Sequence, residues 1–125
     1  MRSFDLLNQD RTQAGLPALT LDPQIAAVAC AHSADMRDRN YFGHRDPDGK
    51  NPAARLRDAG ISFRISGENI SHITGMNDPA RTANDLFLAD AAHRDVLLNP
   101  QFTRVGIGVA RSRTEYWITQ NFIGQ

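Results

Sequence analysis

The first two thirds of the chain show the apolar spacing of helices, with hydrophobic positions recurring every three or four residues. The clearest case is the segment 21–40, whose apolar stripe consists of Ile25, Val28, Ala29, His32 and Met36. This spacing places all of these side chains on one face of a helix. His32 is therefore expected to face the core as an ordinary helical histidine.

Helix starts are marked by three Asx-Pro pairs, because proline suits the first helical position and Asp or Asn can cap it. The pairs are Asp22-Pro23, Asn51-Pro52 and Asp78-Pro79. They predict helices over 22–40, 52–60 and 79–93, the second of which ends at Gly60. A further helix is predicted over 3–15, with Ser3 as its N-cap and Gly15 as its stop.

Strand patterns are weaker in the middle of the chain and clear near its end. Apolar residues alternate over 61–66 and again over 104–110. A polar turn at 111–115 then leads into the apolar segment 116–122, so the last two segments are expected to pair as an antiparallel hairpin. Gly106 and Gly108 alternate with apolar residues, which indicates a face that another part of the chain approaches closely.

Helices followed by a closing hairpin are typical of the α+β class. No repeat, linker or low-complexity tract suggests a second unit, so we expect residues 1–125 to form one domain. The 14 basic and 14 acidic residues cancel, which argues against a nucleic-acid or anionic-membrane partner. We read the scattered basic residues as solvated surface and local ion pairs.

No stretch is apolar and long enough to span a membrane, and the first ten residues lack the apolar core of a signal peptide. The chain is therefore either cytoplasmic or a mature domain whose leader has been trimmed. Its single cysteine, Cys30, lies in an apolar helical run and is expected to be a small buried residue. We expect a monomer.

The segment "ISGENIS" (65–71) contains Glu68, one of only two glutamates in the chain. The other, Glu115, falls in the polar turn at 111–115. Apolar flanks suggest that Glu68 is partly buried, and a buried carboxylate needs partners. We expect it between a strand and a turn, with Gly67 permitting a sharp backbone and Asn69 hydrogen-bonding its own loop.

Three further side chains are candidates for partners. His44 lies in a loop rich in turn-forming residues, and Asp90 and His93 lie three residues apart near the end of the predicted helix 79–93. Each also has a purely structural explanation. His44 could be a turn residue, Asp90 could lie at the exposed edge of the apolar stripe, and His93 could cap the helix end through the helix dipole.

Other polar residues carry weaker signals. Glu68 could simply accept backbone amides. Ser71-His72 lacks the glycine-flanked elbow of a hydrolase serine, and His72 is expected at the surface.

The order of several motifs resembles the CAP superfamily of cysteine-rich secretory proteins, antigen 5 and plant pathogenesis-related proteins. These motifs are "HSADM", "YFGHRDPDG", "GENIS", "AAHRDVLLNPQFTRVGIGV" and "YWITQNF". The chain is most similar to the compact bacterial branch. The resemblance implies an α-β-α sandwich with a small antiparallel sheet between helices, a cleft on one side, and an extracellular or periplasmic location.

The same resemblance implies a cleft with two histidines and two acids. Matched position by position, these are His44, Glu68, His93 and Asp90. Asp90 is placed through Phe87, which stands where animal relatives have tryptophan, and many bacterial relatives have serine at the position of Asp90. The absence of disulfides and the presence of Asp95 in place of the usual asparagine are further departures.

Two imidazoles and two carboxylates in one cleft suit three roles. They could bind a divalent metal at His44 and His93, with zinc favoured and calcium or magnesium as alternatives. They could form a general acid/base pair, or they could be a structural hydrogen-bond network. No organic cofactor is expected.

Among functions, we favour a secreted ligand-binding module for a small molecule, peptide or lipid. The alternatives are a metal-dependent hydrolase using water activated by His44, His93 and Glu68, and lipid or sterol binding in a groove between helices. Binding is favoured over catalysis because no serine, threonine or cysteine is paired with histidine by a known motif and H-E-x-x-H is absent.

Overall fold

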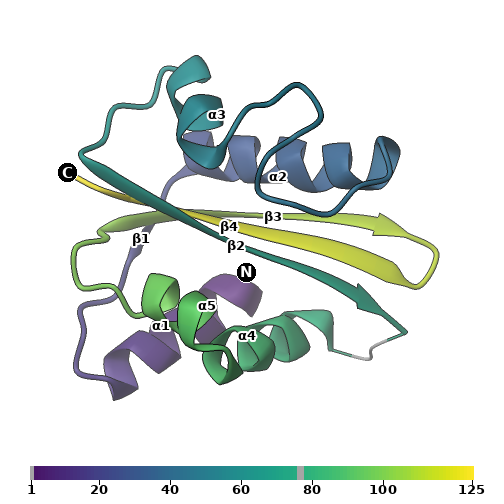
Figure 1. Ribbon diagram of the computed structural model, residues 1–125. Coiled ribbons are helices and arrows are strands. Elements are labelled where there is room, and N and C mark those ends of the chain that lie inside the picture. Colours follow the sequence, from purple (N-terminus) through teal and green to yellow (C-terminus); the bar gives the residue numbers. More distant parts are fainter. Residues whose placement is uncertain (1, 76–77) are drawn as a thin grey trace.

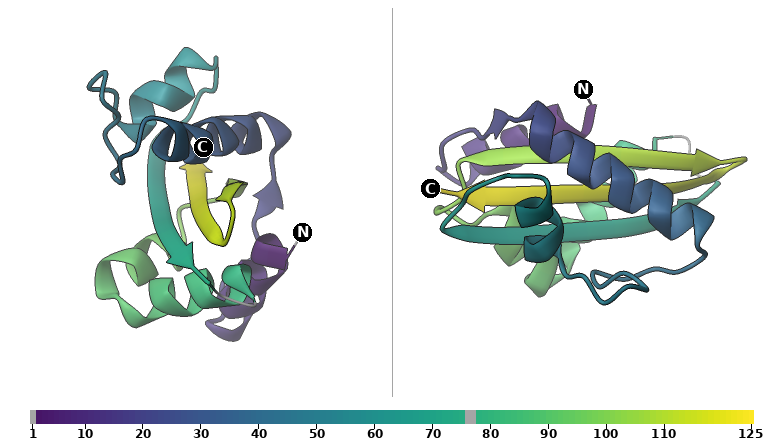
Figure 2. Two further views of the ribbon diagram at one scale, coloured as in Figure 1. Left: turned by 90° about the vertical axis from the view of Figure 1, so that its right-hand side faces the viewer. Right: turned by 90° about the horizontal axis from the view of Figure 1, so that it is seen from above.

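A central sheet lies between two layers of helices, as the ribbon in Figure 1 and the end-on view in Figure 2 show. The computed structural model describes residues 2–75 and 78–125. In chain order its elements are α1 (Arg2–Gln13), β1 (Thr20–Leu21), α2 (Pro23–Asp38), α3 (Pro52–Asp58), β2 (Ile65–Thr74), α4 (Pro79–Ala89), α5 (Ala91–Leu97), β3 (Arg104–Ser112) and β4 (Glu115–Gly124). The expected α+β sandwich is confirmed.

The strand order in the sheet is β1-β3-β4-β2. The predicted hairpin of β3 and β4 is present, and β2 pairs antiparallel with β4 on its other side. The short β1 runs parallel to β3, so the sheet is mixed where an antiparallel sheet was expected. Among the described residues, β2 therefore forms one edge of the sheet, and the site described below is built around it.

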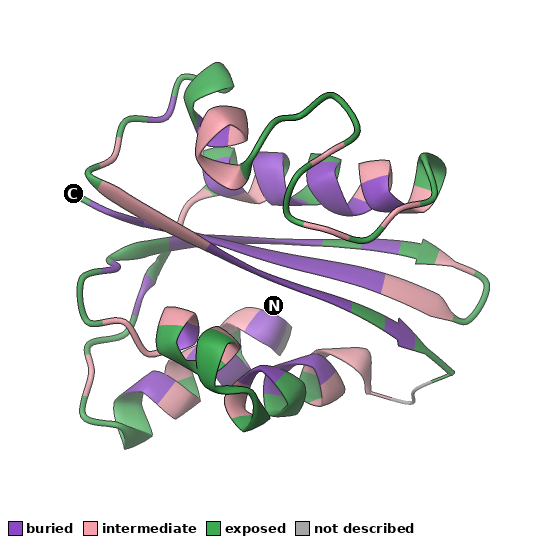
Figure 3. Cartoon of the chain, in the orientation of Figure 1, coloured by how far each residue is buried: buried purple, intermediate pink, exposed green. Residues whose placement is uncertain are grey.

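Each face of the sheet has its own apolar core, and Figure 3 shows buried residues on the sides of the helices that meet the sheet. On one face α1, α4 and α5 cover the sheet, with Leu7, Phe87, Leu97, Val105 and Phe122 among the buried residues. On the other face α2 and α3 pack through two clusters that include Ile25, Leu56, Met36 and Trp117. Successive side chains of the strands therefore pack alternately against one helical layer and the other.

The Asx-Pro helix starts are confirmed. Asp22 accepts hydrogen bonds from the backbone N–H groups of Gln24 and Ile25, and Asn51 and Asp78 cap α3 and α4 in the same way. The start of α1 was predicted wrongly, because Ser3 lies inside the helix and is buried. Gly15 and Gly60 follow their helices with φ of +81°, where glycine is the favoured residue.

The prediction of a close approach at the two glycines of β3 is confirmed. A Cβ on Gly106 would lie 2.1 Å from the backbone nitrogen of Ala26, and one on Gly108 would lie 2.1 Å from that of Cys30. Helix α2 therefore rests directly on the backbone of β3. This contact fixes the height of α2 above the sheet.

Three element boundaries differ from the prediction. The strand expected over 61–66 is β2, which begins only at Ile65 and continues to Thr74, so "ISGENIS" is strand and not turn. The helix expected over 79–93 is broken at Asp90 into α4 and α5. Glu115 belongs to β4, since the connection between β3 and β4 is shorter than the predicted turn.

Two surface and core assignments were also wrong. Cys30 is exposed on the outer side of α2, because its backbone and not its side chain meets the sheet. Arg11 is not a solvated residue but is fully buried, and its guanidinium donates to the carbonyl oxygens of Pro17, Leu97 and Asn99 at 3.0, 3.1 and 2.9 Å. Helix α1 is thereby tied to the end of α5.

Candidate functional site

Glu68 is buried on the face of β2 that meets α2 and α3, with a side chain only 1% exposed. Oε1 lies 2.8 Å from Nδ1 of His44 and accepts from Nη2 of Arg55 at 3.2 Å. Oε2 accepts from Nη1 of Arg55 and from Nδ2 of Asn121, both at 2.8 Å. Both carboxylate oxygens are therefore fully occupied inside the protein.

The partners of Glu68 come from three separate elements. Asn121 is its register partner on β4. Arg55 projects from α3 and also donates to the backbone carbonyl of His44, so it holds both the side chain of Glu68 and the loop that carries His44. The result is a closed network joining the sheet, α3 and the loop after α2.

The ionised form of Glu68 is favoured by these contacts. Burial on its own would raise the pKa of the carboxyl, but hydrogen bonds from His44, Arg55 and Asn121 outweigh burial and hold the pKa below its usual value. Glu68 therefore carries its charge inside the protein, where it can orient His44.

His32 supports the same loop from α2. As predicted it is buried, and its Nε2 lies 2.9 Å from the carbonyl oxygen of Gly43 and 3.9 Å from Oε1 of Glu68. Burial lowers the pKa of His32, which favours the neutral ring. A neutral His32 that donates from Nε2 anchors the backbone next to His44 without adding charge.

Asp90 and His93 form a second pair on the opposite face. Asp90 is the N-cap of α5 and accepts from the backbone N–H of His93 at 3.2 Å. Its Oδ2 also lies 2.7 Å from Nδ1 of His93. The structural alternative that His93 caps a helix C-terminus is wrong, because His93 lies in the first turn of a new helix.

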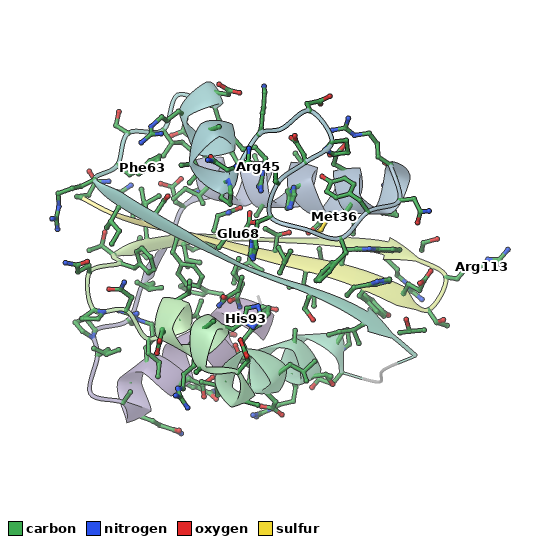
Figure 4. All side chains as sticks on the ribbon, in the orientation of Figure 1. Met36, Arg45, Phe63, Glu68, His93 and Arg113 are labelled. Atoms are coloured by element: carbon green, nitrogen blue, oxygen red, sulfur yellow. The ribbon has the colours of Figure 1, made fainter. Side chains whose placement is uncertain are left out.

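Asn69 fixes the backbone of His93 from β2. Its Nδ2 donates to the carbonyl oxygen of His93 at 3.2 Å, whereas the sequence suggested a bond within its own loop. Glu68 and Asn69 are consecutive in a strand, so their side chains point to opposite faces. Each thus holds one histidine, and Figure 4 shows Glu68 and His93 on opposite sides of the β2 ribbon.

Gly67 completes the "GEN" motif for a reason other than the one expected. It has no positive φ, and a Cβ at this position would lie 2.8 Å from the ring of Phe102. The missing side chain makes room for packing below β2, not for a sharp turn.

The two histidines line one cleft of about 620 Å³ along the outer edge of β2. Its lining consists of Phe42, Gly43, His44, Ile70, Ser71, His72, Leu86, Phe87, Asp90 and His93. Of the four candidate residues, His44, Asp90 and His93 border this space. Glu68 does not, because it is buried behind His44.

Each of the two imidazoles has a carboxylate next to its Nδ1. Nδ1 of His44 is hydrogen-bonded to Oε1 of Glu68 at 2.8 Å, and because a carboxylate can only accept, that nitrogen carries the proton and Nε2 of the neutral ring keeps a free lone pair. Nδ1 of His93 lies 2.7 Å from Oδ2 of Asp90, within ion-pair distance. This is the arrangement in which a carboxylate orients a metal-binding histidine.

Within residues 2–75 and 78–125 no group of three or more His, Cys, Asp or Glu side chains is arranged to hold a metal ion. A closed site with four protein ligands is therefore not formed by these residues. Two imidazoles with water or ligand atoms in the other positions are the donor set that the cleft offers.

Sequence reasoning missed Arg55, Asn121 and the role of Asn69. Arg55 is separated from Glu68 by 13 residues and the pair spans two elements, so no local periodicity reports it. Asn121 could have been found by writing out the register of the strands, because it lies directly opposite Glu68. His72 is exposed, as expected, and lies 3.1 Å from Glu115, a pair that the register also brings together.

The chain belongs to the CAP family, described as the cysteine-rich secretory protein family, whose profile matches residues 4–122. It is similar to the uncharacterized protein YkwD of Bacillus subtilis (strain 168), with 36% identity over 97% of this chain and 45% of that protein. The uncharacterized membrane protein YlbC of the same strain is 38% identical over 96% of this chain and 33% of its own length. The chain thus spans less than half the length of these curated relatives.

Solved structures agree with this assignment. An extracellular protein containing a SCP domain from Bacillus anthracis is 39% identical, with a TM-score of 0.86 over 98% of this chain and 39% of that chain. An outer surface protein from Borrelia burgdorferi shares the fold at 16% identity, with a TM-score of 0.87 over 98% of this chain and 89% of that one. NaASP2 with Zn²⁺ shares the fold at 12% identity, with a TM-score of 0.73 over 99% and 81%.

Among the described residues, none of the helices has the length and apolar character needed to cross a membrane.

Proposed function

We propose that this protein is an extracytoplasmic ligand-binding module whose cleft holds its ligand between His44 and His93, together with a divalent cation on the two Nε2 atoms. One observation carries the proposal: two imidazoles from separate layers line one cleft, and each has a carboxylate against its Nδ1. Zinc is the favoured ion because it accepts imidazole ligands and tolerates open positions.

The location outside the cytoplasm is supported by the relatives. The Bacillus anthracis protein is described as extracellular and shares 39% of its residues with this chain over the matched region. NaASP2 has a structure with Zn²⁺, but at 12% identity that likeness concerns the fold. The metal proposal therefore rests on the imidazoles of this chain.

Binding is better supported than hydrolysis. A hydrolase of the type considered above would use Glu68 as the base that activates a water molecule. Both oxygens of Glu68 are occupied by His44, Arg55 and Asn121, and the side chain is only 1% exposed. A carboxylate in this position can orient an imidazole but does not reach a water molecule in the cleft.

The metal part is tested by calorimetric titration of zinc into the wild type and a His44→Ala/His93→Ala double variant. We expect binding to the wild type and its loss in the double variant. His72→Ala is the matched control, since this third imidazole also lines the cleft but directs Nε2 to Glu115 at 3.1 Å. Indistinguishable curves for the wild type and the double variant would end the metal proposal.

Asp90→Asn separates the two roles of Asp90. Asparagine caps a helix about as well as aspartate, so we expect the free energy of unfolding to stay within about 0.5 kcal/mol. The carboxylate against Nδ1 of His93 is lost, and we expect zinc affinity to fall about 10–100-fold. Unchanged zinc affinity would show that Asp90 serves α5 alone.

A further inference from the structure

The floor of the cleft is the free edge of a β-sheet. β2 pairs with β4 on one side only, and among the described strands none lies on its other side. Ile70, Ser71 and His72 of this strand line the cleft. A free edge presents backbone N–H and C=O groups that can pair with another chain.

The register shows which backbone groups point outward. The N–H of Gly75 donates to the carbonyl of Thr114, its partner in the register continued one residue past β2, at 2.9 Å. On the other side of β4 the carbonyl of Ile123 accepts from Thr103 at 2.9 Å, so odd-numbered residues of β4 turn toward β3 and even-numbered ones toward β2. Hydrogen-bonded pairs alternate along an antiparallel ladder. Counting along the register, Ser71 and Ile73 bond to β4, while the N–H and C=O groups of Ile70 and His72 point away from it into the cleft.

These outward groups have no partner within the part of the chain that the structure describes. None of its hydrogen bonds outside the regular helices and strands involves the backbone N–H or C=O of Ile70 or His72. Regular edge strands are usually shielded by a bulge, a proline or charged side chains. Over these residues the strand is unbroken and carries none of these features.

The edge is also recessed between two walls. The loop 42–44 borders it on one side, and α4 and α5 border it on the other, as the position of β2 between these segments in Figure 1 illustrates. Each wall contributes one large exposed apolar side chain, Phe42 and Leu86, both 53% exposed. The edge strand of a second copy would be equally recessed, so the walls keep two such edges from meeting.

We propose that the ligand of this cleft is an extended peptide segment that adds to β2 as an additional strand. Among ligand classes, an extended polypeptide repeats donors and acceptors at the spacing of Ile70 and His72. Its alternating side chains would point in turn to the wall of Phe42 and His44 and to the wall of Leu86 and His93. This inference rests on the proposed function, since it names the ligand class of the same cleft.

The experiment starts from a displayed library of random seven-residue peptides selected on the wild-type protein. A selected peptide is then synthesised as a series with one N-methylated amide each. We expect N-methylation at alternate positions to weaken binding about 10-fold, because each lost bond leaves a backbone acceptor of β2 unpaired. The intervening positions should change little. Amide hydrogen exchange of Ile70 and His72 should slow when the peptide is bound.

A matched pair of variants tests the strand itself. His72→Pro removes an outward N–H that β2 does not use toward β4, and proline is tolerated on an edge strand in that orientation. His72→Ala removes the imidazole but keeps the N–H. We expect peptide affinity to be about 10-fold lower in His72→Pro than in His72→Ala, because both variants lack the imidazole and only His72→Pro also lacks the N–H. If His72→Pro does not fold, the N-methyl series decides.

The proposal fails if no peptide is recovered, if N-methylation has no effect with period two, or if the two amides are unprotected in the complex. It also fails if the amides are protected in a dimer of the free protein. Zinc titration of the same preparation separates the two proposals: zinc binding without peptide binding overturns only the strand addition, and loss of both overturns the proposed function as well.

Discussion

Glu68 shows how a single buried charge is kept ionised. Its carboxylate is surrounded by a guanidinium, an imidazole and an amide, so burial costs are offset by charge-assisted hydrogen bonds. Removing the carboxylate would leave Arg55, whose side chain is 10% exposed, without its counter-charge.

We therefore expect Glu68→Ala to lower the free energy of unfolding by about 3–5 kcal/mol, the cost of breaking a buried ion pair on one side. Urea unfolding at neutral pH measures this. The control is Glu115→Ala, which removes the only other glutamate. Its pair with His72 is partly exposed, so the loss there should be below about 1 kcal/mol. Equal losses in the two variants would contradict the network.

The pH dependence of stability has a defined sign at Glu68. Its pKa in the folded protein is lower than in the unfolded chain, so the unfolded chain takes up a proton first as the pH falls. The contribution of Glu68 is complete above about pH 4.3 and is lost as the pH falls through the folded pKa. Urea unfolding from pH 7 to pH 3 should show this loss, and Glu68→Gln should show a smaller slope below pH 4.3.

At the scale of elements, the sequence predicted helices better than strands. The Asx-Pro starts are local signals, because the capping side chain and proline act within one turn. β2 was mostly missed because its side chains do not alternate between apolar and polar. Both of its faces are covered by helices, and Glu68 and Asn69 are satisfied by partners distant in sequence. An alternation of apolar and polar residues is expected only for a strand with one face in contact with water, and β2 has no such face.

The break at Asp90 was missed for a related reason. The apolar spacing continues from α4 towards α5, so periodicity alone predicts one helix. The one available signal is Asp90 itself, a good N-cap residue three positions before His93. That signal is ambiguous, because an aspartate is also common on an exposed helical surface.

The contact between α2 and β3 gives a graded prediction. In Gly108→Ala the new Cβ meets helix backbone at 2.1 Å, whereas in Gly67→Ala it meets the Phe102 ring at 2.8 Å. A side chain can shift but a packed helix backbone cannot. We expect a loss of about 1–3 kcal/mol for Gly67→Ala and a larger loss for Gly108→Ala, measured by urea unfolding. The reverse order would mean that α2 is not seated as described.

At the scale of the whole molecule, Arg11 joins the first helix to the last connection before the hairpin. Its guanidinium donates to carbonyls of Pro17, Leu97 and Asn99, and Leu97 and Asn99 lie more than 80 residues away along the chain. Burial lowers the pKa of Arg11. The buried positive charge is stabilised by the negative ends of peptide dipoles, which are the carbonyl oxygens that accept its hydrogen bonds.

We expect Arg11→Ala to lower the free energy of unfolding by at least about 3 kcal/mol, since hydrogen bonds to a charged donor are worth about 1.5–3 kcal/mol each. Arg81→Ala is the control, because this arginine on α4 is half-exposed and pairs with Asp85 at 3.7 Å. It should change stability by less than about 0.5 kcal/mol. A small effect for Arg11→Ala would show that α1 is held by apolar packing alone.

The candidate site was predictable only in part. His44, Asp90 and His93 were placed on one cleft through the resemblance to the CAP family, and the structure puts them along the same space. The sequence could not show that Glu68 stands behind His44, or that Arg55 holds both. These contacts depend on how the loop after α2 and helix α3 sit above β2, which is set by packing and not by any local pattern.

The consecutive placement of Glu68 and Asn69 has a consequence for how this domain can vary. Glu68, which contacts His44, and Asn69, which contacts His93, are joined by one peptide bond, because successive side chains of a strand point to opposite faces. Inserting or deleting a single residue in β2 ahead of Glu68 would exchange the two side chains between the layers, and would break the contact to the ring of His44 and the contact to the backbone of His93 at once. Insertions and deletions among relatives are therefore expected in the loops around β2 and not within the strand itself.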